Sequence, residues 1–168
     1  PSIDVPQLKF SPEALAKLQQ DYIAEASQLW NQSLQANPTI KDKRFAGEAW
    51  SANPLASFTA AVYLLNARTL MAMAEAVEGD AKAKNRVRFA VEQWMAAAAP
   101  SNYLAFNPDA QRMAIDSHGA SLAKGVANML QDMKQGHVSM TDESVFEVGK
   151  NVATTEGAVV FENDLFQL

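Results

Sequence analysis

Apolar residues recur every three or four positions along most of the chain, and this spacing predicts amphipathic α-helices. The first helix starts at Ser11-Pro12-Glu13, where a capping residue precedes a proline and an acid, and it ends before Asn37-Pro38. Its apolar positions are Leu15, Leu18, Tyr22, Ala26 and Leu29.

The most apolar segment follows a second cap and proline, Asn53-Pro54, and runs from Leu55 to about Val77. A bilayer span needs about twenty apolar residues. Arg68 and Glu75 interrupt this run too early, so we expect the central helix of a core and no transmembrane segment. Further helices are expected after Asp80, after Asn107-Pro108 and around Leu122–Met133.

From His137 onward the helical spacing ends. Val159, Phe161 and Leu165 lie in an alternating stretch, which suggests a strand whose partner is in another chain or in missing sequence. The fold class predicted is therefore mainly α: a compact bundle of about five helices with an extended C-terminal segment or strand.

The composition excludes several classes of function. The 168 residues are 48% hydrophobic and 20% charged, as in globular domains, and the net charge of −5 argues against nucleic-acid binding. With no cysteine the chain has no disulfide and no thiolate nucleophile, which is compatible with the cytoplasm. Pro1–Phe10 does not have the pattern of a signal peptide, and both ends look cut, so we expect a fragment of a longer protein.

Catalytic chemistry finds little support in the sequence. The candidate bases are His118 and His137, and Gly119–Ala123 only partly matches a nucleophile elbow, which would need a preceding strand. A helix cap is the better interpretation of Ser121. No metal-ligand spacing and no glycine-rich phosphate loop is present. We therefore assign no catalytic, cofactor-binding or metal residue, and no cofactor.

Large apolar side chains are the remaining candidates for a role. Phe45 and Trp50 are expected to anchor the irregular segment 38–53 to the bundle. The full set of candidate structural or interface anchors is Phe45, Trp50, Trp94, Phe106 and Phe146. The basic stretch Lys82–Arg88 is either a solvated face or a site for an acidic or phosphate-bearing partner, and the methionines either pack the core or contact a partner.

Three stretches, at residues 42–70, 99–133 and 141–168, together resemble the N-terminal domain of class I polyhydroxyalkanoate synthases. Those bacterial enzymes polymerise 3-hydroxyacyl-CoA into storage polyester in a downstream α/β-hydrolase-like domain with a cysteine nucleophile. The resemblance implies a variable N-terminal helical segment (1–40), a helical core (41–136), and a turn and extended segment (137–168) leading toward an absent catalytic domain.

The same resemblance implies a non-catalytic role at the surface of cytoplasmic storage granules. The implied partners are the catalytic domain of the same synthase, phasin-type granule proteins, the polymer surface and a second copy in the parent dimer. Two alternatives stay open: an independent phasin-like granule coat protein, and a generic helical protein-interaction module.

Overall fold

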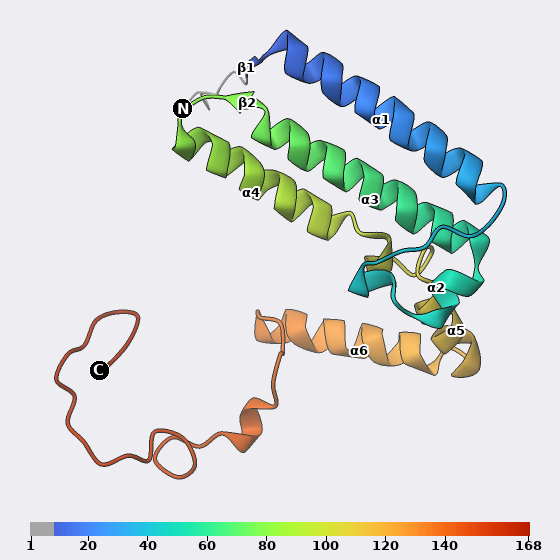
Figure 1. Ribbon diagram of the computed structural model, residues 1–168. Coiled ribbons are helices and arrows are strands. Elements are labelled where there is room, and N and C mark those ends of the chain that lie inside the picture. The colour runs from blue at the N-terminus through green and yellow to red at the C-terminus, as the bar shows by residue number, and fades with distance from the viewer. Residues whose placement is uncertain (1–8) are drawn as a thin grey trace. The chain divides into compact units, whose positions relative to one another are not determined.

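The computed structural model describes residues 9–168, which form two compact units divided after Ser121. The described residues contain six α-helices and one two-stranded sheet, so the mainly α prediction is confirmed. In the first unit, α1 (Pro12–Ser33), α3 (Pro54–Glu75) and α4 (Ala81–Ala97) lie side by side with α3 in the middle (Figure 1).

Side-chain caps fix where these helices begin. The Oδ1 atom of Asn53 accepts from the backbone N–H groups of Leu55 and Ala56 at 3.0 and 3.1 Å, and Pro54 has no N–H to leave unsatisfied. Asn107 caps α5 (Pro108–Asp116) in the same way. The capping residues therefore mark the helix starts as the sequence predicts.

The core lies where α3 meets the segment before it. That segment is not irregular throughout, because it contains a 3₁₀ turn (Lys43–Phe45) and α2 (Glu48–Ala52), which the sequence analysis missed. Ala56, Ala60 and Ala67 present small side chains on one face of α3, and Phe45 and Trp50 pack against that face with ring centroids 4.8 Å apart.

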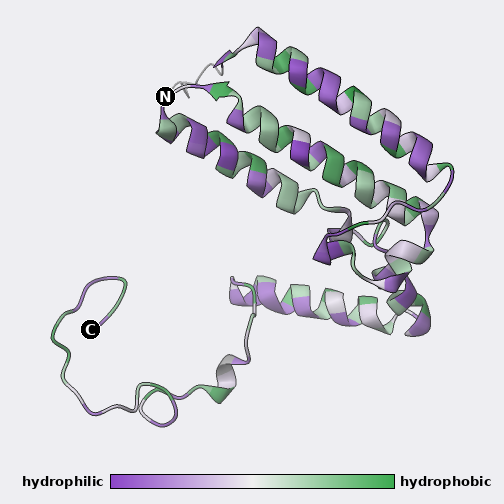
Figure 2. Cartoon of the chain, in the orientation of Figure 1, coloured by the Kyte–Doolittle hydropathy of each residue, from purple (hydrophilic) through white to green (hydrophobic). Residues whose placement is uncertain are grey.

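Two short strands were also missed. β1 (Lys9–Phe10) pairs antiparallel with β2 (Val77–Glu78), and Phe10 lies opposite Val77, which is almost fully buried. The sheet joins the start of α1 to the end of α3. Figure 2 shows that α3 is the most hydrophobic of the three long helices.

By length and composition alone, α3 could cross a membrane, and it is the one such helix in residues 9–168. In the structure it packs against α1, α2 and α4. Its buried residues are Ala56, Ser57, Ala60, Tyr63, Leu65, Ala67 and Ala74. This burial is typical of the central helix of a core.

The second unit, described by itself, contains most of α6 (Ala120–Gln135) and a 3₁₀ turn (Glu143–Val145). No strand forms at 159–166. Asn163 Oδ1 instead accepts from the N–H groups of Leu165 and Phe166 and turns the chain, so that Glu162 bridges Gln167. Of the two predicted alternatives, the extended segment is therefore found and the strand is not, because a side-chain turn breaks the alternating stretch and pairs it with itself.

A tight turn closes α5. The N–H of Gly119 donates to the carbonyl of Ala114 at 2.8 Å and that of His118 to Ile115 at 2.9 Å, which is the Schellman pattern. His118 has a φ of 50°, a left-handed conformation that glycine adopts without steric cost.

We expect His118→Gly to raise the free energy of unfolding by about 0.5–1 kcal/mol, because it removes this strain. Urea unfolding followed by circular dichroism measures the change. His118→Ala is the matched control, since it keeps a β-carbon at the same φ and should leave stability nearly unchanged. Equal stability of the glycine and alanine variants would contradict the interpretation.

Candidate interaction surfaces

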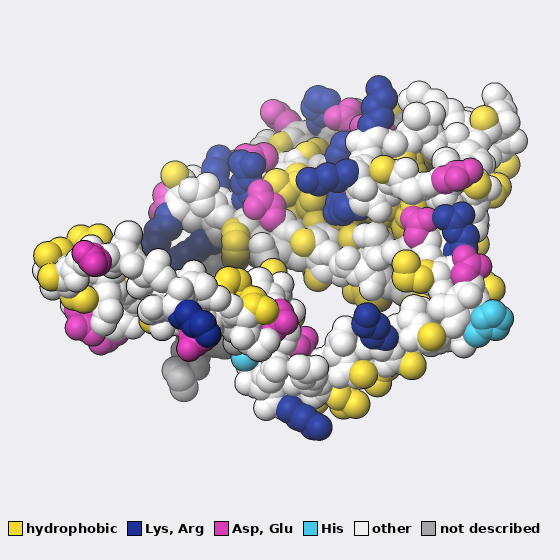
Figure 3. All heavy atoms as spheres, turned by 90° about the horizontal axis from the view of Figure 1, so that it is seen from below, with side chains coloured by type: hydrophobic (Ala, Val, Ile, Leu, Met, Phe, Trp, Pro, Cys, Tyr) yellow, Lys and Arg dark blue, Asp and Glu magenta, His cyan; other side chains and the backbone are white. Residues whose placement is uncertain are grey.

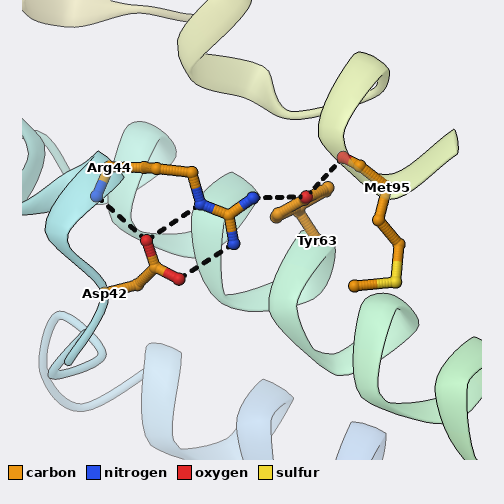
Figure 4. A network of polar contacts seen from close by, with 4 residues as sticks. All are labelled: Asp42, Arg44, Tyr63 and Met95. Carbon is orange, nitrogen blue, oxygen red and sulfur yellow. Dashed lines mark hydrogen bonds and ion pairs between the residues drawn. The ribbon is translucent and has the colours of Figure 1, made fainter. Parts of the chain in front are cut away.

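An arginine fixes the segment 38–53 to two helices (Figure 4). Arg44 donates to both carboxylate oxygens of Asp42, from Nε at 3.0 Å and from Nη2 at 2.9 Å. Its Nη1 donates to the hydroxyl of Tyr63 on α3 at 2.8 Å, and that hydroxyl donates to the carbonyl of Met95 on α4 at 2.6 Å. One side chain thus connects the segment to α3, and through Tyr63 to α4.

The charges of this network are mutually stabilising. The side-chain hydrogen bond from Arg44 lowers the pKa of Asp42, although partial burial opposes the shift. The same bond raises the pKa of Arg44, so the guanidinium stays charged. That cation lies 5.6 Å from the ring centroid of Phe45 and 5.2 Å from that of Tyr63, within the range of cation–π attraction. The network therefore joins three parts of the first unit through hydrogen bonds and charge.

A shallow hollow of about 320 Å³ lies on the first unit, between α3 and the residues that end and follow α4. Two of the predicted anchors, Trp94 and Phe106, line it together with Tyr103. These three aromatic side chains are 57%, 55% and 49% exposed. The hollow is therefore apolar and open, which suits contact with an apolar partner better than enclosure of a small substrate.

The other predicted anchors lie elsewhere. Phe45 and Trp50 are both in the core, 3% and 1% exposed. Phe146 is in the second unit and is exposed. The structure thus places Phe45 and Trp50 together in the core, and Trp94 and Phe106 together in the hollow. The sequence analysis missed Asp42, Arg44 and Tyr63, although the Asp-x-Arg pair beside Phe45 was the available signal.

Ser121, which the sequence analysis considered as a nucleophile and as a helix cap, lies in a hydrogen-bonded turn of the helix. Ser121 lies inside α6, and its N–H and hydroxyl are both 3.1 Å from the hydroxyl oxygen of Ser117. Ser117, and not Ser121, is therefore the capping side chain. In residues 9–168, no group of three or more His, Cys, Asp or Glu side chains is placed to hold a metal ion.

Besides the aromatic hollow, the amphipathic helix α6 presents an apolar face. Five apolar side chains within one arc of the helix are each 45–71% exposed. They are Leu122, Val126, Met129, Leu130 and Met133. On the face that Figure 3 shows, hydrophobic side chains are exposed between interspersed acidic and basic ones.

Comparison with known proteins identifies the family to which the chain belongs. Residues 41–168 match the family described as "Poly-beta-hydroxybutyrate polymerase (PhaC) N-terminus", and the chain belongs to this family. The match covers the Arg44 network, the aromatic hollow and α6. No solved structure matches the chain.

Full-length relatives support the same assignment. The chain is 52% identical to the poly(3-hydroxyalkanoate) polymerase subunit PhaC of Cupriavidus necator, over 96% of the chain and 28% of that protein. It is 38% identical to the poly(3-hydroxyalkanoate) polymerase of Methylorubrum extorquens, over 78% of the chain and 22% of the relative. It is 39% identical to the poly(3-hydroxyalkanoate) polymerase 2 of Ectopseudomonas oleovorans, over 80% of the chain and 24% of that relative. The chain thus spans about a quarter of the length of these relatives.

Removing the buried indole should destabilise the first unit. We expect Trp50→Ala to lower the free energy of unfolding by about 3 kcal/mol, because it leaves a cavity between Phe45 and α3. Chemical unfolding measures the loss. Trp94→Ala is the matched control, since that indole is 57% exposed and its removal should cost much less. Equal losses in the two variants would show that Trp50 does not anchor the segment.

The Asp42–Arg44 pair should make stability depend on pH. Because folding lowers the pKa of Asp42, the pair stabilises the fold above the ordinary carboxyl pKa of about 3.9, and this contribution is lost as the pH falls through the lowered folded-state pKa. Asp42→Asn should therefore lower stability at neutral pH and flatten its decline in acid. Urea unfolding between neutral pH and about pH 3 tests both effects.

The control for this experiment is Asp116→Asn, which changes an exposed aspartate that has no described ion pair. It should keep the acid decline of the original chain. An identical pH profile for Asp42→Asn and the original chain would contradict the role of the pair.

Proposed function

We propose that this chain is the non-catalytic N-terminal region of a polyhydroxyalkanoate polymerase. The observation that carries the proposal is the family match over residues 41–168, and the polar network that the match covers joins the segment 38–53 to α3 and α4. In this proposal the polymerisation of 3-hydroxyacyl-CoA takes place in the remainder of the parent polymerase. The 168-residue chain supports that reaction without performing it.

The supporting role has three parts in this proposal: association with the storage granule in the cytoplasm, binding of granule proteins, and stabilisation of the active dimer. The exposed aromatic side chains Trp94, Tyr103 and Phe106 favour such contacts, because aromatic residues are enriched at interaction surfaces. With α3 as a core helix, the proposed attachment is to a surface and not across a membrane.

A full-length chimera tests this function. The aligned N-terminal region of the Cupriavidus necator polymerase is replaced by this chain, and CoA release from 3-hydroxybutyryl-CoA is followed. We expect the chimera to retain most of the activity of the parent polymerase, whereas deletion of the same region should lower it. A chimera no more active than the deletion variant would refute the supporting role.

The isolated chain provides the complementary test. Given 3-hydroxybutyryl-CoA, it should release no CoA above background, and release would refute its non-catalytic assignment. An independent coat protein is the second candidate, favoured by the exposed apolar face of α6. A coat protein would bind polymer granules by itself. The chimera that contains this chain would then be no more active than the deletion variant.

A further inference from the structure

We propose that the hollow lined by Trp94, Tyr103 and Phe106 binds a proline-rich segment of a partner protein in the polyproline II conformation. We call this site the aromatic hollow. The inference rests on the proposed function and names the chemistry of the partner that this surface takes. All residues that line the hollow lie in the first unit, so its geometry is defined within that unit.

The aromatic hollow combines apolar walls with unpaired donors. Three aromatic rings line it, and Pro100 lies among them. Two further donors belong to lining side chains: within residues 9–168, neither Nε1 of Trp94 nor Nδ2 of Asn66 has a hydrogen-bond acceptor. Both N–H groups carry partial positive charge, so they complement an occupant that presents carbonyl oxygens.

The oxygen atoms of the lining residues are mostly engaged already. The carbonyl oxygens of Trp94 and Pro100 accept from backbone N–H groups at 2.8 and 3.2 Å. Oδ1 of Asn66 accepts from the hydroxyl of Tyr22 at 3.0 Å. An occupant rich in N–H groups would leave those donors poorly paired, which costs free energy. The hollow therefore favours an apolar chain with carbonyl oxygens and few N–H groups, and proline residues have no N–H.

The wall of the hollow is arranged by bonds within the first unit. Nδ2 of Asn102 donates to the carbonyl of Ala96 at 2.8 Å, and the hydroxyl of Tyr103 donates to the carbonyl of Ala97 at 2.9 Å. The N–H of Phe106 donates to the carbonyl of Tyr103 at 2.9 Å. Binding to a prearranged wall loses little conformational entropy on the protein side.

The size of the hollow selects among peptide conformations. Its volume of about 320 Å³ is near the lower end of the range of about 300–1,000 Å³ for ligand pockets. A helical partner needs a longer groove for anchors on successive turns, and an added strand needs a sheet edge. The one sheet in residues 9–168 pairs β1 with β2 and does not line the hollow. Aromatic-lined grooves instead take short proline-rich segments, whose polyproline II helix is preformed.

A single chain of storage polyester is the competing occupant. It also presents carbonyl oxygens without N–H groups. A polyester chain is flexible, however, and would lose more conformational entropy in the hollow than a preformed polyproline II segment. The observations therefore favour the proline-rich segment, and the polyester becomes an outcome of the test.

Nuclear magnetic resonance of the isotope-labelled chain tests the proposal directly. The chain has three tryptophans, Trp30, Trp50 and Trp94, which give three indole N–H signals. Acetylated decaproline is the probe. We expect it to shift the Trp94 signal in a saturable way and to leave the other two in place, because only Trp94 lines the aromatic hollow.

Variants with a matched control measure the contribution of the ring. Trp94→Ala should weaken binding of decaproline by about tenfold or more in titration calorimetry, because aromatic anchors dominate such interfaces. Trp94→Phe keeps a ring without the N–H group and should lose less. Trp30→Ala is the control: Trp30 is 58% exposed against 57% for Trp94, and it lies outside the hollow. It should keep the original affinity, and circular dichroism verifies that each variant folds.

Other probes separate the possible occupants. A peptide of alternating glycine and serine, matched in length to decaproline, should not bind. A soluble oligomer of 3-hydroxybutyrate that shifts the Trp94 signal at lower concentration than decaproline would overturn the proposal in favour of polyester. Absence of a shift with decaproline would also overturn it, and so would equal affinity of the original chain and Trp94→Ala.

The proposed function is tested separately from this inference. A chimera with the Cupriavidus necator polymerase that retains CoA release, built from a chain that does not bind decaproline, would refute the inference alone. A chimera no more active than the deletion variant would count against the proposed function, whatever the result with the peptide.

Discussion

The first unit depends on the hydroxyl group of Tyr63. This side chain is only 8% exposed, so its polar atom must find partners inside the protein. It accepts a hydrogen bond from Arg44 and donates one to the carbonyl of Met95, and both of its hydrogen-bonding functions are used. The segment 38–53, α3 and the end of α4 are thereby held in one arrangement. A phenylalanine would keep the packing and leave both partners without this contact.

That arrangement is possible because α3 is narrow where the aromatic residues approach it. Alanines at 56, 60 and 67 leave room for Phe45 and Trp50, and the hydroxyl of Ser57 donates to the carbonyl of Trp50 at 2.6 Å. The first unit therefore has a small core with satisfied polar groups. In the second unit, described by itself, the large apolar side chains of α6 are 45–71% exposed.

The helices were predictable because short-range chemistry determines them. Asn53, Asp80 and Asn107 accept hydrogen bonds from the first turns of their helices, and this capping depends on neighbouring residues only. The β1–β2 pair and the Arg44–Tyr63 contact join residues far apart in sequence, so no local pattern shows them. The predicted strand near Phe161 failed because Asn163 offers the backbone a competing turn.

The sequence identified the large apolar side chains that form the candidate surfaces, but not which of them are exposed. Phe45 and Trp94 were both chosen as large apolar side chains, but one is buried and the other lines an open hollow. Periodicity places Trp94 among the apolar positions of α4, but it does not determine how much of the indole the neighbouring elements cover. Its exposure depends on where α3 and the segment after α4 pass, which is a property of the tertiary fold.

The boundary of the family match has a structural explanation. The match begins at residue 41, although α1 packs along α3 and belongs to the first compact unit. No residue of α1 is buried, and its side-chain contacts with α3 include the exposed Arg68–Glu25 ion pair and the Tyr22–Asn66 hydrogen bond. Exposed ion pairs contribute about 0–1 kcal/mol, so many different side chains could serve there. A helix with no fully buried residue places weaker demands on its side chains than the core positions of Trp50 and Tyr63, which are 1% and 8% exposed.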